Sequence, residues 1–98
     1  MVRTSRKLVD THAHICDPLF DADREEVLRN AAAAGVGAVI AVGENISDAR
    51  KNIEQAEAHP ILRPAAGLYP TTLVPAQADE MLAFIRNERS KLNALSSK

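Results

Sequence analysis

The sequence predicts an α/β fold in which three strands form one parallel sheet. Short apolar runs that suit strands alternate along the chain with longer segments whose apolar residues recur at helical spacing. Glycine, proline and aspartate fall between these segments, where turns are expected. Because parallel strands joined by helices require right-handed crossovers, three such units in a row predict one sheet with helices packed against it.

The first unit begins with a short strand over residues 7–11, after a polar lead-in at residues 1–6 that we expect to be frayed. Asp21 or Asp23 can cap the helix that follows, and the acidic residues of its first turn favour the helix dipole. Gly35 is expected to end the helix. The apolar positions that repeat at helical spacing are Val27, Leu28, Ala31 and Ala34.

The second unit contains the clearest strand of the chain, at residues 36–42. This nearly unbroken apolar run is typical of a parallel strand that is covered on both faces. Ser47 is expected to cap the next helix, and His59 with Pro60 to close it. The buried stripe of that helix is expected to contain Ile46, Ala49, Ile53 and Ala56.

The third unit has a weaker strand at residues 61–67, because Arg63 and Pro64 interrupt its apolar pattern. A loop with two prolines follows at residues 68–75. The last helix is expected from about Ala78 onward. Its inward positions are expected to be Met81, Leu82, Ile85, Leu92 and Leu95.

Composition excludes several classes of protein. A chain of 98 residues makes at most one domain, and a net charge of -1 provides no basic face for tracking nucleic acid, so any such contact would be local. The single cysteine, Cys16, excludes an internal disulfide and suits a reducing compartment, for which the cytoplasm is the expectation. Neither a signal peptide nor a membrane span is expected from the apolar pattern.

Two histidines close to the first strand are the strongest candidate for chemistry. In a regular strand alternate side chains point to the same face, so Asp10, His12 and His14 are expected to project together. Two imidazoles on one rigid element can bind a single divalent ion such as Zn²⁺ and leave positions for carboxylates and water. The alternative at this point is a chance spacing of two histidines without function.

The position of these histidines also favours one architecture. A flavodoxin-like or Rossmann sheet would need a glycine-rich phosphate loop after its first strand, and residues 11–18 contain no glycine. A TIM (β/α)8 barrel carries its chemistry at the carboxyl ends of its strands, where His12 and His14 fall. We therefore expect three βα units of such a barrel, with a parallel sheet and an incomplete barrel.

Three motifs carry a resemblance to a known family. They are VDTHAH at residues 9–14, FDADREEVL at residues 20–28 and AGLYP at residues 66–70. In this order and at this spacing the chain resembles the amino-terminal part of a TatD-type deoxyribonuclease, a metal-dependent hydrolase of the amidohydrolase-like superfamily. The resemblance covers about residues 7–86, so residues 1–98 are expected to form the amino-terminal part of such a hydrolase domain. The family usually has histidines at the third motif, whereas this chain has Tyr69, Thr71 and Thr72.

The resemblance implies a site and an activity. His12 and His14 would be metal ligands. From its place one strand period earlier, we expect Asp10 either to orient an imidazole by accepting its hydrogen bond or to serve as a buried, hydrogen-bonded carboxylate. The complete family has a two-metal site, occupied by Zn²⁺, Mg²⁺ or Mn²⁺, that activates water to cleave DNA phosphodiesters. The resemblance assigns no catalytic residue, and the family's further ligands lie beyond the part that these residues match. We therefore expect the 98-residue chain alone to be inactive on DNA.

Two other functions remain open at this stage. The chain could be a truncated, non-catalytic barrel fragment that at most binds metal or self-associates through exposed strand edges. It could also belong to another amidohydrolase-like phosphoesterase, because the His-x-His motif is shared across that superfamily.

Three further residues have simpler expected roles. Glu44 follows the second strand, and we expect a solvated loop or helix-cap role for it. Cys16 is expected to be a small, partly buried thiol rather than a ligand. His59 is well placed against the dipole at a helix C-terminus and needs no function.

Overall fold

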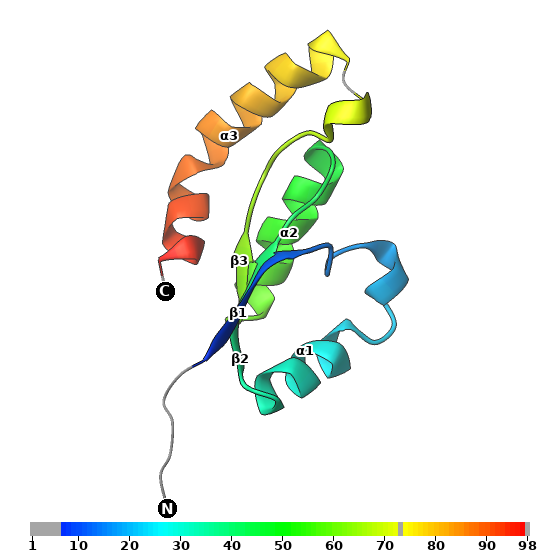
Figure 1. The fold of residues 1–98 in the computed structure, drawn as a ribbon. Helices are drawn as coiled ribbons and strands as arrows, with labels where there is room; N and C mark the ends of the chain where they lie inside the picture. Colours follow the sequence, from blue (N-terminus) through cyan, green and yellow to red (C-terminus); the bar gives the residue numbers. More distant parts are fainter. Residues whose placement is uncertain (1–6, 73, 98) are drawn as a thin grey trace, which may run out of the picture.

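The structure, a computed structural model, describes residues 7–72 and 74–97, so the expected polar lead-in at residues 1–6 lies outside the described residues. Within the described part, the parallel sheet has three strands in the order β1-β2-β3. Strands and helices alternate along the chain, as predicted (Figure 1). The elements are β1 (Leu8–Ala13), α1 (Arg24–Ala33), β2 (Val36–Ala41), α2 (Ile46–Ala58), β3 (Leu62–Pro64) and α3 (Pro75–Ser96), with short 3-10 turns at Pro18–Phe20 and Pro70–Thr72.

Helices cover the sheet through two apolar clusters. One lies between the strands and the helices α1 and α2, and the other lies between α2 and α3. Three small side chains, Ala41, Ala49 and Ala56, are almost completely buried, which lets α2 lie close to the strand and the helix beside it. The buried members of the two clusters are Ile15, Cys16, Leu28, Val39, Ala41, Ala56 and Leu62, then Ala49, Ile53, Met81 and Phe84.

The boundaries of the strands differ from the expectation. β1 ends at Ala13, two residues later than predicted, and thereby includes His12. β3 is confined to Leu62–Pro64, because Pro64 has no N–H to continue a regular ladder. The N–H of Ala65 still donates to the carbonyl of Ala41 at 2.9 Å, so the chain stays beside β2 for one more residue.

The N-termini of two helices also need correction. α2 is capped by Asn45, whose side-chain oxygen accepts the N–H of Asp48 at 2.9 Å, whereas the predicted cap Ser47 lies inside the first turn. α3 begins at Pro75 rather than near residue 78. Proline suits the first helical position because its missing N–H would have no partner there. Gly35 ends α1 as predicted, with a positive φ of 105° that favours glycine.

The inward face of α3 is rotated from the predicted stripe. Met81 and Phe84 are buried, whereas Leu82, predicted to face inward, is 48% exposed. Successive helical residues are about 100° apart, so Phe84 takes the position beside α2 that Leu82 cannot reach.

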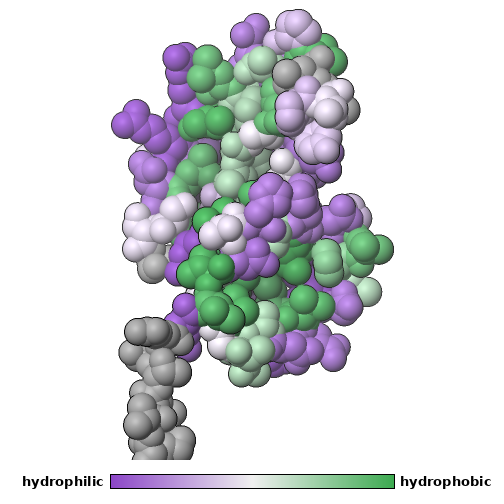
Figure 2. Space-filling view, in the orientation of Figure 1, coloured by the Kyte–Doolittle hydropathy of each residue, from purple (hydrophilic) through white to green (hydrophobic). Residues whose placement is uncertain are grey.

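The sheet is open within the described residues, with β1 and β3 at its edges. Near the start of β1, Leu8 is 67% exposed and Val9 is 54% exposed. Figure 2 shows hydrophobic side chains at the surface of the molecule in this view, between polar regions. Three parallel strands alternate with helices, as predicted, and this arrangement is consistent with part of a TIM barrel.

Candidate metal centre

The two histidines lie at the carboxyl end of β1. His12 is in the strand, and His14 follows its last residue directly. Both side chains are exposed. Their rings meet edge to face, with centroids 5.3 Å apart and planes at 66°. The structure therefore brings together the two imidazoles that the sequence analysis identified, at the edge where a parallel βα fold carries its chemistry.

The side chain of Asp10 contacts the main chain of His12. Its Oδ1 accepts a hydrogen bond from the backbone N–H of His12 at 3.1 Å. The pairing of β1 with β2 shifts between Asp10 and Ala13, where three steps along β1 match two along β2, from Val39 to Ala41. The strict alternation of a regular strand is therefore interrupted between Asp10 and the histidines.

The segment after His14 turns sharply into the core. The N–H of Asp17 donates to the carbonyl of His14 at 3.1 Å, which closes a turn, and the Asp17 carboxylate accepts the N–H of Leu19 at 2.9 Å. Within this turn Ile15 and Cys16 are buried in the apolar cluster against the sheet. Burial raises the pKa of the Cys16 thiol, so this side chain is a buried neutral thiol, close to the expectation.

Arg24, the first residue of α1, holds this segment through hydrogen bonds. Its side chain is buried, and its Nε donates to the carbonyl of Ile15 at 2.8 Å. Its Nη2 donates to the carbonyl of Asp17 at 2.9 Å and to Oδ1 of Asp21 at 2.8 Å. Lys51 of α2 donates to the same Asp21 oxygen at 2.7 Å. The hydrogen bond from Lys51, followed by that from Arg24, lowers the pKa of the Asp21 carboxyl.

A small pocket lies beside His14, between the ends of the strands and α2. Its volume of about 20 Å³ is enough for one water molecule. Glu44 is exposed on the loop after β2, and its N–H donates to Oδ2 of Asp48 at 2.8 Å. A side chain at Gly43 would place its Cβ 2.3 Å from that of Asp48, so this close approach requires glycine. The pocket is lined by His14, Cys16, Asp17, Val42, Glu44, Asp48 and Asn52.

Asn52 holds the carboxyl ends of β2 and β3 together. Its Nδ2 donates to the carbonyl of Ala41 at 3.1 Å and to the carbonyl of Ala65 at 3.2 Å. The residue is completely buried, and its Oδ1 has no hydrogen-bond partner among the described residues. Sequence analysis missed it. The signal was a polar residue three positions after Ala49 and four before Ala56, on the apolar stripe of α2.

The third motif reaches the same edge through its backbone. The N–H of Tyr69 donates to the carbonyl of Glu44 at 2.9 Å, which ties the loop after β3 to the loop after β2. Tyr69 and Thr71 are exposed, and the side chain of Thr72 lies outside the described residues. The departure from the family motif therefore places a phenol, rather than an imidazole, on this loop.

The donor set fits the beginning of a metal site. Two imidazoles on one tetrahedral zinc ion, with Zn–N bonds of about 2.1 Å, have ring centroids about 5 Å apart. The observed separation of 5.3 Å between His12 and His14 agrees with that spacing. Among residues 7–72 and 74–97, no group of three or more His, Cys, Asp or Glu side chains is placed to hold an ion. The described residues thus supply two ligands, and the rest of the coordination would come from other donors.

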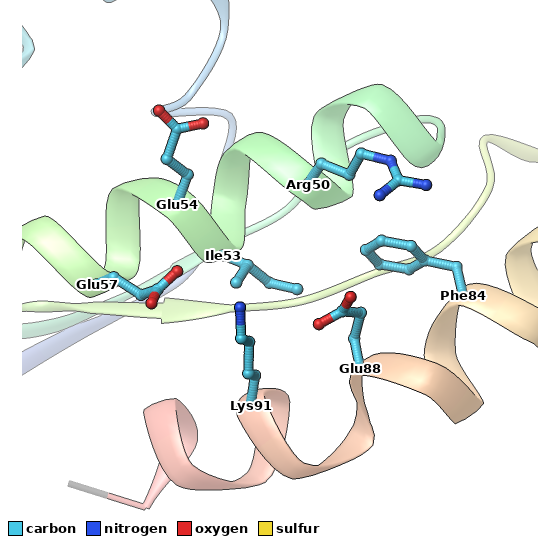
Figure 3. Close-up of a pocket in the computed structure, with 7 residues that line it drawn as sticks. All are labelled: Arg50, Ile53, Glu54, Glu57, Phe84, Glu88 and Lys91. Carbon is cyan, nitrogen blue, oxygen red and sulfur yellow. The ribbon is translucent and has the colours of Figure 1, made fainter.

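A second hollow, between α2 and α3, has a different character. Figure 3 shows its lining, in which Arg50 lies over the ring of Phe84, 5.1 Å from the centroid. Its volume is about 180 Å³, and it is lined by Arg50, Ile53, Glu54, Glu57, Phe84, Glu88 and Lys91. Neither histidine of the pair belongs to it, and its mixed charges favour no single class of ion.

Fold and site together define a parallel α/β segment with paired histidines at the carboxyl end of its first strand. The profile of the family "TatD related DNase" matches residues 9–96. The chain therefore belongs to the TatD-related DNase family, as its motifs indicated. In the part that the structure describes, no helix has the length and apolar character needed to cross a membrane.

Curated relatives agree with this assignment. The chain is 31% identical to "Deoxyribonuclease TATDN3" of Homo sapiens over an aligned length of 98 residues. The aligned region covers 90% of this chain and 36% of that protein. It is 36% identical to "Uncharacterized metal-dependent hydrolase YjjV" of Escherichia coli (strain K12), over 68% of this chain and 26% of the relative. It is 32% identical to "Uncharacterized metal-dependent hydrolase YabD" of Bacillus subtilis (strain 168), over 81% of this chain and 31% of the relative. The chain thus spans between 26% and 36% of the length of these relatives.

Proposed function

We propose that this chain supplies the first two metal ligands, His12 and His14, of a divalent-metal-dependent hydrolase that cleaves DNA phosphodiesters. The observation that carries the proposal is the pair of exposed imidazoles, 5.3 Å apart, at the carboxyl end of β1. Family membership supports it, as do relatives named as a deoxyribonuclease and as metal-dependent hydrolases. Residues 1–98 would form the amino-terminal part of that hydrolase domain.

The choice of metal follows from the donors. Imidazole nitrogen suits Zn²⁺ and also binds Mn²⁺, whereas Mg²⁺ prefers oxygen ligands and would depend on carboxylates from elsewhere. A bound divalent ion supplies a Lewis acid that polarises a phosphodiester oxygen and makes water a better nucleophile. In the complete site we propose two such ions.

The chain's own residues prepare this site in two ways. Asp10 holds the backbone of His12 through its carboxylate, and we propose that it is the residue that orients this histidine. Asn52 and the bond between Tyr69 and Glu44 hold the ends of the strands and the following loops at one edge. A substrate at this edge would therefore contact loops that hydrogen bonds hold together. A reducing compartment, the cytoplasm, suits the single buried thiol of this chain.

The substrate is tested with a chimera. Residues of the human TATDN3 protein that align with this chain are replaced by the chain itself, and nucleotide release from DNA is measured with Mg²⁺, Mn²⁺ and Zn²⁺. We expect metal-dependent release that is lost when His12 and His14 are both changed to alanine. His59→Ala is the matched control, because His59 caps the far end of α2, and it should keep the activity. Full activity in the double variant would refute the proposal.

A second candidate is a different phosphoesterase, since two relatives are named only as metal-dependent hydrolases. Parallel assays with aryl phosphomonoesters and phosphodiesters distinguish it from a nuclease. For the 98-residue chain alone, we propose no cleavage above the background of free metal ions, because two imidazoles supply only half of a tetrahedral zinc site. Metal-dependent release of nucleotides by the isolated chain, absent from the double histidine variant, would contradict that proposal.

A further inference from the structure

We infer that Arg24 is a positioning residue for the metal centre, one that holds the main chain beyond His14 so that its imidazole stays beside that of His12. This inference rests on the proposed function, since it concerns the same site. Arg24 does not reach the proposed ion. It acts on the segment from which His14 projects.

Arg24 is a charged residue in a buried position. Arg24 is only 6% exposed, although arginine is rarely buried unless its guanidinium is fully engaged. The three acceptors of its Nε and Nη2 groups all lie within residues 15–21, on the connection between β1 and α1. A planar guanidinium with fixed donor directions holds several acceptors in one arrangement, which the single ammonium of lysine does not.

Two of these acceptors lie just beyond His14 in the chain. The carbonyl of Ile15 belongs to the residue directly after His14, and the carbonyl of Asp17 lies two residues further. The N–H of Asp17 turns back to the carbonyl of His14 at 3.1 Å. Consequently the main chain is fixed immediately after His14 by Arg24 and by the turn, while the imidazole itself remains exposed.

The connection that Arg24 holds is also bonded to α2, outside its own βα unit. Lys51 of α2 donates to the same Asp21 oxygen that Arg24 contacts, so the connection is linked to the helix that follows β2. Asp21 thus joins α1 and α2 beside the segment that follows His14. Only the main chain of His14 is fixed by this arrangement, which leaves its ring nitrogens available to an ion.

The test is Co²⁺ binding to the purified 98-residue chain, followed by visible absorption and by the NMR signals of the imidazole rings. In Arg24→Met we expect affinity to fall on the order of tenfold, as for other residues that orient metal ligands. In this variant the NMR signals of the His14 ring should change more than those of the His12 ring. Removing a positive charge near a cation would by itself tighten binding, so a weaker site identifies lost positioning.

Two control variants separate positioning from general damage. Arg29→Met removes a positive charge from an exposed position of the same helix, and affinity should be unchanged or slightly higher. Leu28→Ala destabilises α1 through the core, and, measured where the chain is folded, it should leave the Co²⁺ spectrum intact. If Arg24→Met does not fold, Arg24→Lys replaces it, with an intermediate loss of affinity expected.

The outcomes are distinct. Absence of Co²⁺ binding by the unmodified chain overturns both the proposed metal centre and this inference. Binding that depends on His12 and His14 but is unaltered in both Arg24 variants overturns this inference alone. An equal loss in Leu28→Ala and Arg24→Met assigns Arg24 a purely structural role and also overturns it.

Discussion

Asn52 offers a quantitative test of how the fold holds the carboxyl edge of the sheet. Changing Asn52 to alanine removes the hydrogen bonds to the carbonyls of Ala41 and Ala65, at 3.1 and 3.2 Å. Two neutral hydrogen bonds contribute about 2 kcal/mol together. The cavity left by the side chain adds about 1 kcal/mol. Removing the buried Oδ1, which has no hydrogen-bond partner in the described part of the chain, returns about 1 kcal/mol.

We therefore expect Asn52→Ala to lower the free energy of unfolding by about 2 kcal/mol. The carbonyl of Ala41 keeps the N–H of Ala65 as a donor, so the carbonyl of Ala65 is the group left without its Asn52 partner. Asn52→Asp should lower the free energy of unfolding further than Asn52→Ala at neutral pH, because it places a carboxylate against two carbonyl oxygens. Protonation gives that carboxyl a donor, so the difference between the two variants should shrink as pH falls.

The assay is urea denaturation followed by circular dichroism, with Asn30→Ala as the matched control. Asn30 is exposed on α1, and its loss should change the free energy of unfolding by less than about 0.5 kcal/mol. A change as small as this in Asn52→Ala would refute the reasoning. So would an Asn52→Asp variant as stable as the unmodified chain at neutral pH.

Three further predictions follow from charge, burial and the open sheet. Because Lys51 and Arg24 lower the pKa of Asp21, this carboxylate stabilises the fold above its ordinary pKa of 3.8, and that contribution is lost as pH falls through the lowered value; Asp21→Asn should flatten the acid side of a plot of Tm against pH, and an unaltered profile would count against it. Burial raises the pKa of Cys16 above 9.0, so stability should be full below that pH and fall as pH rises further; Cys16→Ala should remove this alkaline decline, and its persistence would point to another group. The exposed β1 edge should promote self-association, and Val9→Lys should reduce it in sedimentation velocity across a concentration series; equal behaviour of the two chains would exclude this edge.

The fold was predictable where local pattern and packing agree. The apolar run at the second strand, with Gly35 before it, predicted β2 almost to its ends, although only Val39 and Ala41 of this strand are buried, rather than both of its faces. The choice between Asn45 and Ser47 as helix cap was not predictable, since both residue types cap well and the backbone conformation decides. The inward face of α3 was predicted wrongly for a similar reason, because Leu82 and Phe84 both continue a helical stripe.

The candidate site was predictable only as far as short-range spacing reaches. His12 and His14 are two residues apart, so a strand end suffices to bring them together. Asn52 and Arg24 were missed because their acceptors are distant in sequence, 9 to 13 residues for the carbonyls of Ile15, Ala41 and Ala65. Such contacts depend on how α1 and α2 pack against the strands, which periodicity alone does not determine.

The central claim is that His12 and His14 bind one divalent ion together. The most direct measurement is a Zn²⁺ titration of the 98-residue chain, with imidazole signals followed by NMR and stoichiometry by calorimetry. We expect one ion per chain and joint shifts of the His12 and His14 ring signals. Binding should be lost in either single alanine variant and retained in His59→Ala. Zn²⁺ binding that survives in the His12→Ala, His14→Ala double variant, or shifts confined to His59, would contradict it.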